Sequence, residues 1–192
     1  VRAFKRIFRR STAVFTLTFQ AEVRGNVTQL RHYNSLKVDE DYDRYDQKII
    51  ETVDFWNGEF AKQDYPPPIL LDPEIVKAMM YIESRIGYGL EPGNYNVMQV
   101  GNPGDPSLHT LNNDGWISPE TGNVARENEW QAGSVKVLDY GGEAKAGTIE
   151  ESLKWGVRWL YHRAQHTKDG KRFWFTWKQA VNRYGPPKPK GS

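Results

Sequence analysis

Residues 72–85 carry the pattern that most narrows what this chain can fold into. Asp72 stands directly before Pro73 and Glu74; a carboxylate is a preferred helix cap, and proline fits the first helical position. The apolar residues that follow recur at the spacing of one helix face: Ile75, Val76, Met79, Ile82 and Ile86. We therefore predict an amphipathic helix from Asp72 to about Arg85, with that face packed on a core.

Three other segments also predict helices. Residues 39–46 are acidic and indicate the start of a helix that runs to about Lys62, because negative side chains complement the positive end of the helix dipole. Residues 148–151 and residues 176–179 both have the capping-box pattern, a threonine followed three residues later by Glu or Gln. The last helix should be short and end near Tyr184, where a glycine and two prolines follow.

Residues 13–23 differ from these segments, since apolar and polar side chains alternate there. That period is typical of a half-buried strand. We predict two parts: an N-terminal extension over residues 1–38 with a strand or hairpin, and a mainly α (α+β) domain over residues 39–190. Residues 101–148 are rich in Gly, Asn, Asp and Pro, and a loop of that length inside a domain is usually functional.

The composition excludes several classes of site and partner. There are no cysteines, which rules out disulfides, zinc–thiolate centres and thiol nucleophiles. The net charge of +2 is too balanced to indicate a nucleic-acid partner, and no apolar run approaches the ~20 residues of a transmembrane helix. His162 and His166 stand four apart on an expected helix, but no third ligand is in view, so they do not indicate a metal site. We expect neither a metal nor a cofactor.

Glu83 is the anomaly of the predicted helix over residues 72–85. It lies one turn after Met79 and two turns after Val76, at the edge of the apolar face. A carboxyl in that position loses water, which favours its neutral form and raises its pKa. A carboxylic acid that stays protonated near neutral pH can protonate the leaving oxygen of a glycosidic bond. The other interpretation is a structural Glu at the margin of the core, paired with Arg85 or with a main-chain donor.

Four motifs around Glu83 together resemble the SLT-type lytic transglycosylases of the goose-type-lysozyme-like superfamily. They occur in the family's order and span residues 42 to 187. The matching segments are Leu71–Ala78 with Ile82–Ser84, Val97–Val100 for the family's Gly-Leu-Met-Gln-hydrophobic motif, Glu151–Leu160 for its Gly-containing helix, and Ala180–Gly185 for its Ala-Tyr-Asn segment. Asn96 stands where the family has a glycine, Gly185 stands where it has an asparagine, and residues 89–95 replace its usual Ser-x-x-Gly-Ala run.

This resemblance implies a lysozyme-like helical domain and a role for each matched residue. Glu83 would be the catalytic acid and then the base. Ser84 would orient that acid or touch the acetamido group of the substrate. Met98 and Gln99 would line the floor at the cleaved bond, and Tyr184 would form a hydrogen bond near Glu83 and help to hold it.

The resemblance also implies the substrate, which is the peptidoglycan glycan strand, cut at the β-1,4 bond between MurNAc and GlcNAc. Most glycosidases use two carboxylates, whereas lytic transglycosylases manage with one and form a 1,6-anhydroMurNAc end. Goose-type lysozymes add water instead and need a further carboxylate, for which Glu91, Asp105 and Asp114 are the candidates here. The anhydro product is favoured, and hydrolysis stays open.

Two other hypotheses remain beside the enzyme. A non-catalytic module on the same fold could bind peptidoglycan or a partner. Such a module would have no need of a glutamate at position 83, beside Ser84 and before Gln99. An antibacterial effector domain, delivered to its target and blocked by an immunity protein, is suggested by the basic residues of the first ten positions and by the extra N-terminal strand. In each case the expected location is the periplasm or cell wall.

Overall fold

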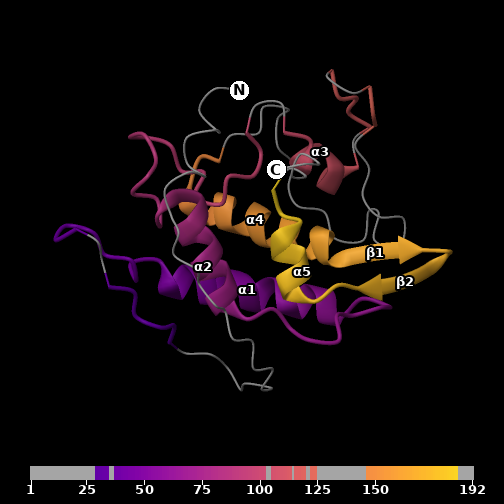
Figure 1. Cartoon of the computed structure of the whole chain (residues 1–192), viewed down its shortest axis with the longest axis horizontal. Coiled ribbons are helices and arrows are strands. Elements are labelled where there is room, and N and C mark those ends of the chain that lie inside the picture. Colours follow the sequence, from indigo (N-terminus) through magenta and orange to yellow (C-terminus); the bar gives the residue numbers. More distant parts are fainter. Residues whose placement is uncertain are drawn as a thin grey trace, which may run out of the picture.

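The computed structural model describes residues 29–34, 37–102, 105–113, 115–119, 122–124 and 146–185. Within these residues the fold is mainly helical, with five α-helices and one two-stranded antiparallel sheet (Figure 1). In chain order the elements are α1 (Asp46–Ala61), α2 (Pro73–Ser84), α3 (Ser107–Asn112), α4 (Ile149–Ala164), β1 (Gln165–Lys168), β2 (Lys171–Trp174) and α5 (Trp177–Asn182). The strand expected over residues 13–23 lies outside the described residues.

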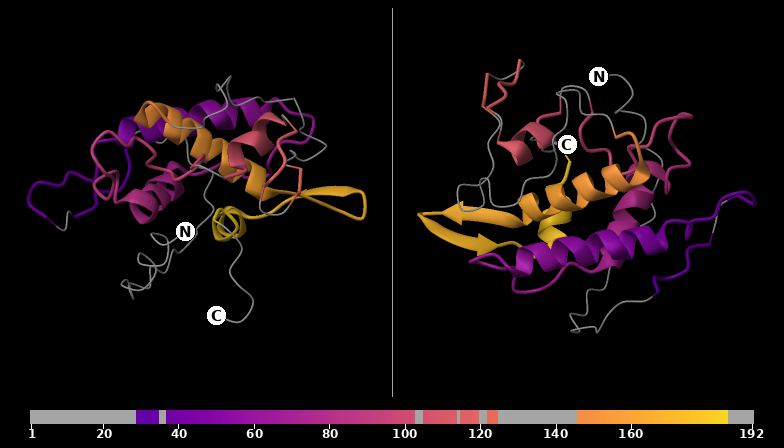
Figure 2. Two further views of the ribbon diagram at one scale, coloured as in Figure 1. Left: turned by 90° about the horizontal axis from the view of Figure 1, so that it is seen from above. Right: turned by 180° about the vertical axis from the view of Figure 1, so that it is seen from behind.

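The core forms where the two longest helices, α1 and α4, lie side by side (Figure 2). Helix α4 also packs on α3 and α5, and α1 packs on α2. The ring of Phe60 stacks on that of Tyr161, with 4.0 Å between the ring centres. Each large apolar side chain that is removed from water in this way contributes about 1.5–3 kcal/mol to folding. The helix faces bury these residues: Ile49, Val53, Trp56 and Phe60 from α1, and Leu153, Val157, Leu160 and Ala164 from α4.

Helix α2 forms close to its predicted bounds, and Ile75, Val76 and Met79 of its predicted apolar face are buried. The prediction is wrong for Ile82, which is 59% exposed although it continues the same spacing. The side chain of Asp72 accepts a hydrogen bond of 2.9 Å from the main-chain N–H of Glu74, and Pro73 occupies the first turn. The prediction that residues 39–46 open helix α1 is wrong at its N-terminal end, because the helix begins only at Asp46. Glu40 and Asp43 of this segment bind Arg85 and Lys77, which lie outside α1.

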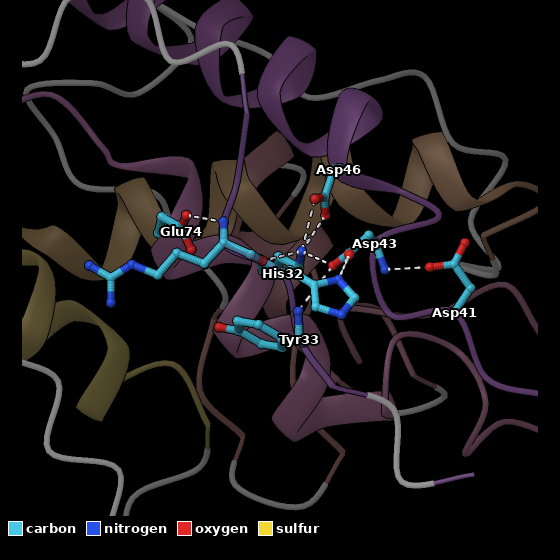
Figure 3. Close-up of polar contacts among 8 residues, drawn as sticks. His32, Tyr33, Asp41, Asp43, Asp46 and Glu74 are labelled. Atoms are coloured by element: carbon cyan, nitrogen blue, oxygen red, sulfur yellow. Dashed lines mark hydrogen bonds and ion pairs between the residues drawn. The ribbon is translucent and has the colours of Figure 1, made fainter. Parts of the chain in front are cut away.

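Lys77 shows where those acidic side chains are used. Its ammonium group is fully buried and donates to the carbonyl oxygen of Arg31 at 2.7 Å, to Asp43 at 2.5 Å and to Asp46 at 2.8 Å. Each of the three ammonium protons thus has an acceptor. Burial of the same cation without these partners would cost a large free energy. Figure 3 shows Asp43 and Asp46 converging on this point. Lys77 therefore fixes α2 to the start of α1 and to the segment before it.

The segment before α1 is held on α2 by further polar contacts. The main-chain N–H of Arg31 donates to Glu74 at 2.5 Å, and that of Tyr33 donates to Asp43 at 3.2 Å. The ring of His32 also bonds to Asp43 (Figure 3). Leu30 lies in the core. The last residues of the predicted N-terminal extension, from Leu30 to Tyr33, therefore pack on the helical domain.

The C-terminal helices and the long loop match their predictions in part. Thr148 caps α4 by accepting from the N–H of Glu151 at 3.1 Å, but the Glu151 carboxylate accepts from Gly147, so only half of that capping box forms. Thr176 and Gln179 form a complete box at α5. The loop over residues 101–148 contains the short helix α3.

The hairpin of β1 and β2 was not predicted, and it corrects the interpretation of the two histidines. Helix α4 ends at Ala164, and Gln165 pairs with Trp174 in an antiparallel register. His166 therefore lies on a strand and not one helical turn after His162. In the described part of the chain, no group of three or more His, Asp or Glu side chains could hold a metal ion. None of the helices there is both long and apolar enough to cross a bilayer.

Candidate active site

Glu83 lies in the last turn of α2, where the helix is stopped abruptly. Arg85 and Ile86 both adopt left-handed backbone conformations, with φ of 51° and 57°. Such a conformation is unfavourable for a β-branched residue such as Ile86, and burial of the Ile86 side chain, which is 0% exposed, holds it there. The stop leaves the half-buried side chain of Glu83 at the end of its helix.

The carboxyl group of Glu83 has no hydrogen-bond or ion-pair partner among the described residues. Burial raises its pKa from 4.5 to about 7, because desolvation penalises the charged form. The expected alternative pairing of Glu83 with Arg85 does not form, because the guanidinium of Arg85 binds Glu40 instead. Glu83 is thus a carboxyl group that exchanges its proton near neutral pH.

The Ser84 hydroxyl forms hydrogen bonds within the turn that ends α2. The side chain is buried, its hydroxyl donates to the carbonyl of Met80 at 3.0 Å, and it accepts from the N–H of Gly87 at 3.0 Å. The N–H of Gly89 also donates to the Ser84 carbonyl at 2.8 Å. Ser84 therefore shapes the turn that follows Glu83, and in this conformation its hydroxyl is covered by protein.

The loop with Met98 and Gln99 is organised around Asn96, a residue that the motif comparison treated as a mismatch. The amide oxygen of Asn96 accepts from the hydroxyl of Ser152 at 3.1 Å and from the N–H of Val100 at 3.2 Å. Its carbonyl accepts from the side chain of Gln99 at 2.6 Å. Gln99 is half-buried with a left-handed φ of 52°, and Met98 is fully buried. No local sequence signal marked Asn96, because its role depends on Ser152, which is 56 positions away.

Three of the four motifs meet at Met98. The Tyr184 hydroxyl donates to the Met98 carbonyl at 3.0 Å, and the Met98 N–H donates to the Ser152 hydroxyl at 3.0 Å. A Cβ atom added to Gly156 would lie 2.4 Å from the Cβ of Met98 and 2.9 Å from the Tyr184 hydroxyl oxygen. Only glycine therefore lets α4 approach the loop this closely.

Tyr184 connects this junction to Glu83 electrostatically. Burial raises the pKa of Tyr184 well above its usual value, and the negative charges of Glu83 and Asp105 raise this pKa further. Both carboxylates thus lie within electrostatic reach of one buried hydroxyl. The hydroxyl itself binds Met98, so any effect of Tyr184 on the position of Glu83 is transmitted through the Met98 loop.

The candidates for a second carboxylate differ in their surroundings. Asp105 accepts from the main-chain N–H groups of Gly101 at 3.2 Å and Ser107 at 2.8 Å, at the start of α3. Glu91 is exposed in the loop after α2. Asp114 lies outside the described residues. Of the two described candidates, Asp105 is therefore the one whose charge, like that of Glu83, acts on Tyr184.

Comparison with known proteins adds no relative to this picture. No protein-family model, curated protein or solved structure matches the chain. The function must therefore be inferred from the chain's own residues: the Glu83 carboxyl, and the buried Tyr184 hydroxyl whose pKa Glu83 and Asp105 raise.

Proposed function

We propose that this protein is a peptidoglycan-cleaving muramidase of the lytic-transglycosylase type, on a lysozyme-like helical domain, with Glu83 as its acid and base. The observation that carries the proposal is the state of the Glu83 carboxyl. It is half-buried, it has no hydrogen-bond or ion-pair partner among the described residues, and its pKa is about 7. A group with that pKa can give up a proton and take one back at neutral pH.

The surroundings of Glu83 support the same reaction. A structural carboxylate is usually stabilised by cations or hydrogen bonds, which lower its pKa, as Lys77 and His32 do for Asp43. Glu83 lacks that support although Arg85 is only two residues away and binds Glu40. Three of the four motifs that resemble the family also converge, because Tyr184, Met98 and Gly156 are in direct contact.

The reaction needs one proton donor that becomes a proton acceptor. Glu83 gives its proton to the oxygen that joins C1 of MurNAc to C4 of GlcNAc, and the C1–O bond breaks. The acetamido oxygen of the substrate assists at C1. The Glu83 carboxylate then takes the proton of the C6 hydroxyl, whose oxygen bonds to C1 and closes the 1,6-anhydro ring. Glu83 ends protonated, and no water is consumed.

The surroundings of Asp105 favour the anhydro product over hydrolysis assisted by Asp105. A hydrolase needs a second carboxylate to direct water, and both oxygens of Asp105 already accept main-chain N–H groups. Peptidoglycan strands are then the partner of the site, and the periplasm or cell wall is where it acts. An immunity protein that covers Glu83 is the partner expected if the domain is a delivered antibacterial effector.

The test is to incubate purified peptidoglycan sacculi with the protein and with Glu83→Gln, and to identify released muropeptides by mass spectrometry. Glutamine keeps the shape of the side chain and cannot act as an acid. We expect 1,6-anhydro products from the wild type alone. Products heavier by one water would indicate hydrolysis and direct attention to Asp105. No release by either protein would contradict the enzyme and favour a non-catalytic peptidoglycan-binding module.

A further inference from the structure

The C-terminal part of the described chain is strongly cationic, although the whole protein is not. The full chain has a net charge of only +2. Residues 163–185 contain six cationic side chains and one acidic side chain, Asp169. These residues form the end of α4, the hairpin of β1 and β2, and α5, which Figures 1 and 2 show as one contiguous part of the molecule. The cations are Arg163, Lys168, Lys171, Arg172, Lys178 and Arg183.

The side chain of one of these cations, Arg163, lies against the main chain of another, Arg183. The Nε atom of Arg163 donates to the main-chain carbonyl of Arg183. Burial lowers the pKa of Arg163, and the positive charge of Arg183 lowers it further. In the described part of the chain neither guanidinium forms an ion pair with a carboxylate, whereas Lys48, Lys77 and Arg85 do.

Aromatic rings hold both guanidinium groups in place. The guanidinium carbon of Arg183 lies 4.4 Å from the centre of the Phe175 ring, and that of Arg163 lies 5.3 Å from the centre of the Trp159 ring. Phe173 packs on Phe175, with 5.4 Å between ring centres. Stacking on aromatic rings fixes a guanidinium while its N–H groups stay available. We name these five residues the cationic–aromatic surface.

Helix capping explains only part of this arrangement. Arg163 is in the last turn of α4 and Arg183 directly follows α5, and cations are favourable at helix C-termini. Arg163 satisfies a free carbonyl there through one N–H of its five donors. Capping gives no reason for a second guanidinium beside the first, since like charges repel. A bound anion would remove that repulsion.

The cationic–aromatic surface adjoins the candidate active site. The indole N–H of Trp159 donates to the main-chain carbonyl of Tyr184 at 3.0 Å, and Arg183 precedes Tyr184 in the chain. The hydroxyl of Tyr184 reaches Met98, and its pKa responds to Glu83. A polymer bound at Glu83 could therefore extend over Arg183 and Arg163.

We propose that Arg163 and Arg183 bind carboxylate groups that hang from the glycan strand cut at Glu83. The proposal rests on the proposed function, because it takes that strand as the ligand. Peptidoglycan carries carboxylates on its peptide stems and, where a stem is absent, on the lactyl group of MurNAc. A planar guanidinium matches a carboxylate with two parallel hydrogen bonds. The surface thus anchors the charged substituents of the strand while Glu83 acts on its backbone.

Binding should be measured on the non-cleaving Glu83→Gln protein, by co-sedimentation with purified sacculi. Adding Arg183→Gln should weaken binding about tenfold, the loss of one charge-assisted contact. The main-chain carbonyl that Arg163 uses stays in place in this variant. Lys178→Gln makes the same charge change on an exposed residue of α5 and should alter binding less than twofold, since Lys178 has no part in the arginine pair.

Two treated substrates distinguish the source of the carboxylate. Removal of the stems with an amidase yields soluble glycan strands that carry the lactyl carboxylate, and binding to these strands is measured by isothermal titration calorimetry. Coupling of all carboxylates of the sacculi to a neutral amine leaves none. Loss of the Arg183 effect on both substrates assigns the contact to the stems, and its loss only after coupling assigns the contact to the lactyl group. An Arg183 effect that persists after coupling would overturn the proposal.

Cleavage assays separate this proposal from the proposed function. With Glu83 intact, Arg183→Gln should raise KM with little change in kcat, as loss of uniform binding does. If the wild type cleaves sacculi and Arg183→Gln matches it in KM and in binding, the carboxylate site is wrong and the muramidase stands. If the wild type releases nothing and binds no sacculi, both fail.

Discussion

The hydroxyl group of Tyr184 lies 3.0 Å from the main-chain carbonyl oxygen of Met98 and donates a hydrogen bond to it. Both groups are buried. This single bond connects the chain after α5 to the loop that presents Gln99, across 86 positions of sequence. The negative charge of Glu83 raises the pKa of Tyr184, so this bond lies within electrostatic reach of that carboxyl and should matter to chemistry there.

Tyr184→Phe should damage both stability and cleavage. It removes the donor and leaves the buried Met98 carbonyl unsatisfied, which costs about 1–3 kcal/mol. The junction of Tyr184 and Met98, which lies within electrostatic reach of Glu83, would then be less firmly held, and kcat should fall about tenfold. Urea unfolding and muropeptide release measured on the folded protein would check the two effects separately.

Tyr161→Phe is the matched control for that change. Tyr161 is also a buried tyrosine, and its hydroxyl binds the side chain of Asn57 at the α1–α4 contact. It should lose a similar free energy of unfolding while the folded protein keeps its cleavage rate. Equal loss of cleavage in both variants would mean that the Tyr184–Met98 bond has no particular role at the site.

Gly156→Ala should disrupt the same junction by crowding. An added Cβ would lie 2.4 Å from the Cβ of Met98, so the loop or α4 must shift, and overpacking of this kind costs about 1–3 kcal/mol. Gly58→Ala is the control, because nothing lies within 4 Å of a Cβ at Gly58 in α1. It should stabilise the protein by about 0.5–1 kcal/mol. A lower midpoint temperature of thermal unfolding for Gly156→Ala and a higher one for Gly58→Ala would confirm the close approach at Gly156.

The sequence predicted the elements with strong local signals. Asp72 and Pro73 begin α2 as expected, and Thr176 with Gln179 begins α5. Those signals depend on neighbouring residues, so they can be recognised in a single sequence. Glu83 was recognisable for the same reason, since its place at the edge of an apolar helix face predicts desolvation.

The elements that the sequence did not predict depend on distant partners. The acidic residues before Asp46 looked like the first turn of a helix, yet Asp43 binds Lys77, 34 positions away. His166 continued a helical spacing, but pairing with Phe173 places it on a strand. Asn96 departed from the motif, and its role depends on Ser152 in α4. In each case tertiary pairing outweighed the local pattern.

The pKa of Glu83 predicts how cleavage depends on pH. The proposed first step needs the protonated acid, and the pKa is about 7. The rate of muropeptide release should therefore fall about tenfold for each pH unit above 7. A pH profile of kcat from 5 to 9 would measure this descent. A rate that stays constant up to pH 9 would mean that a group other than Glu83 donates the proton.

Lys77→Ala should be among the most damaging single changes outside the candidate site. The change leaves Asp43 and Asp46 facing each other without their shared cation, and removal of one partner of a buried ion pair costs about 3–5 kcal/mol. Lys48→Ala removes an exposed pair with Glu150 and should cost less than about 1 kcal/mol. Urea unfolding would compare them, and equal losses would contradict the role assigned to the buried ammonium.

Glu83→Gln should stabilise the protein in a pH-dependent way. Burial holds the pKa of Glu83 at about 7 in the folded state, against 4.5 for an unperturbed glutamate. Below pH 4.5 both the folded and the unfolded wild type keep the proton, so the variant should match it. Between pH 4.5 and 7 Glu83 ionises freely only in the unfolded wild type. The free energy of unfolding of the wild type therefore falls relative to that of the Glu83→Gln variant. Above pH 7 the difference should level off on the order of 1–2 kcal/mol, since contact with water reduces the full penalty. Urea unfolding at pH 4, 6 and 8 would measure it, and a constant difference would show that Glu83 does not carry its proton at neutral pH.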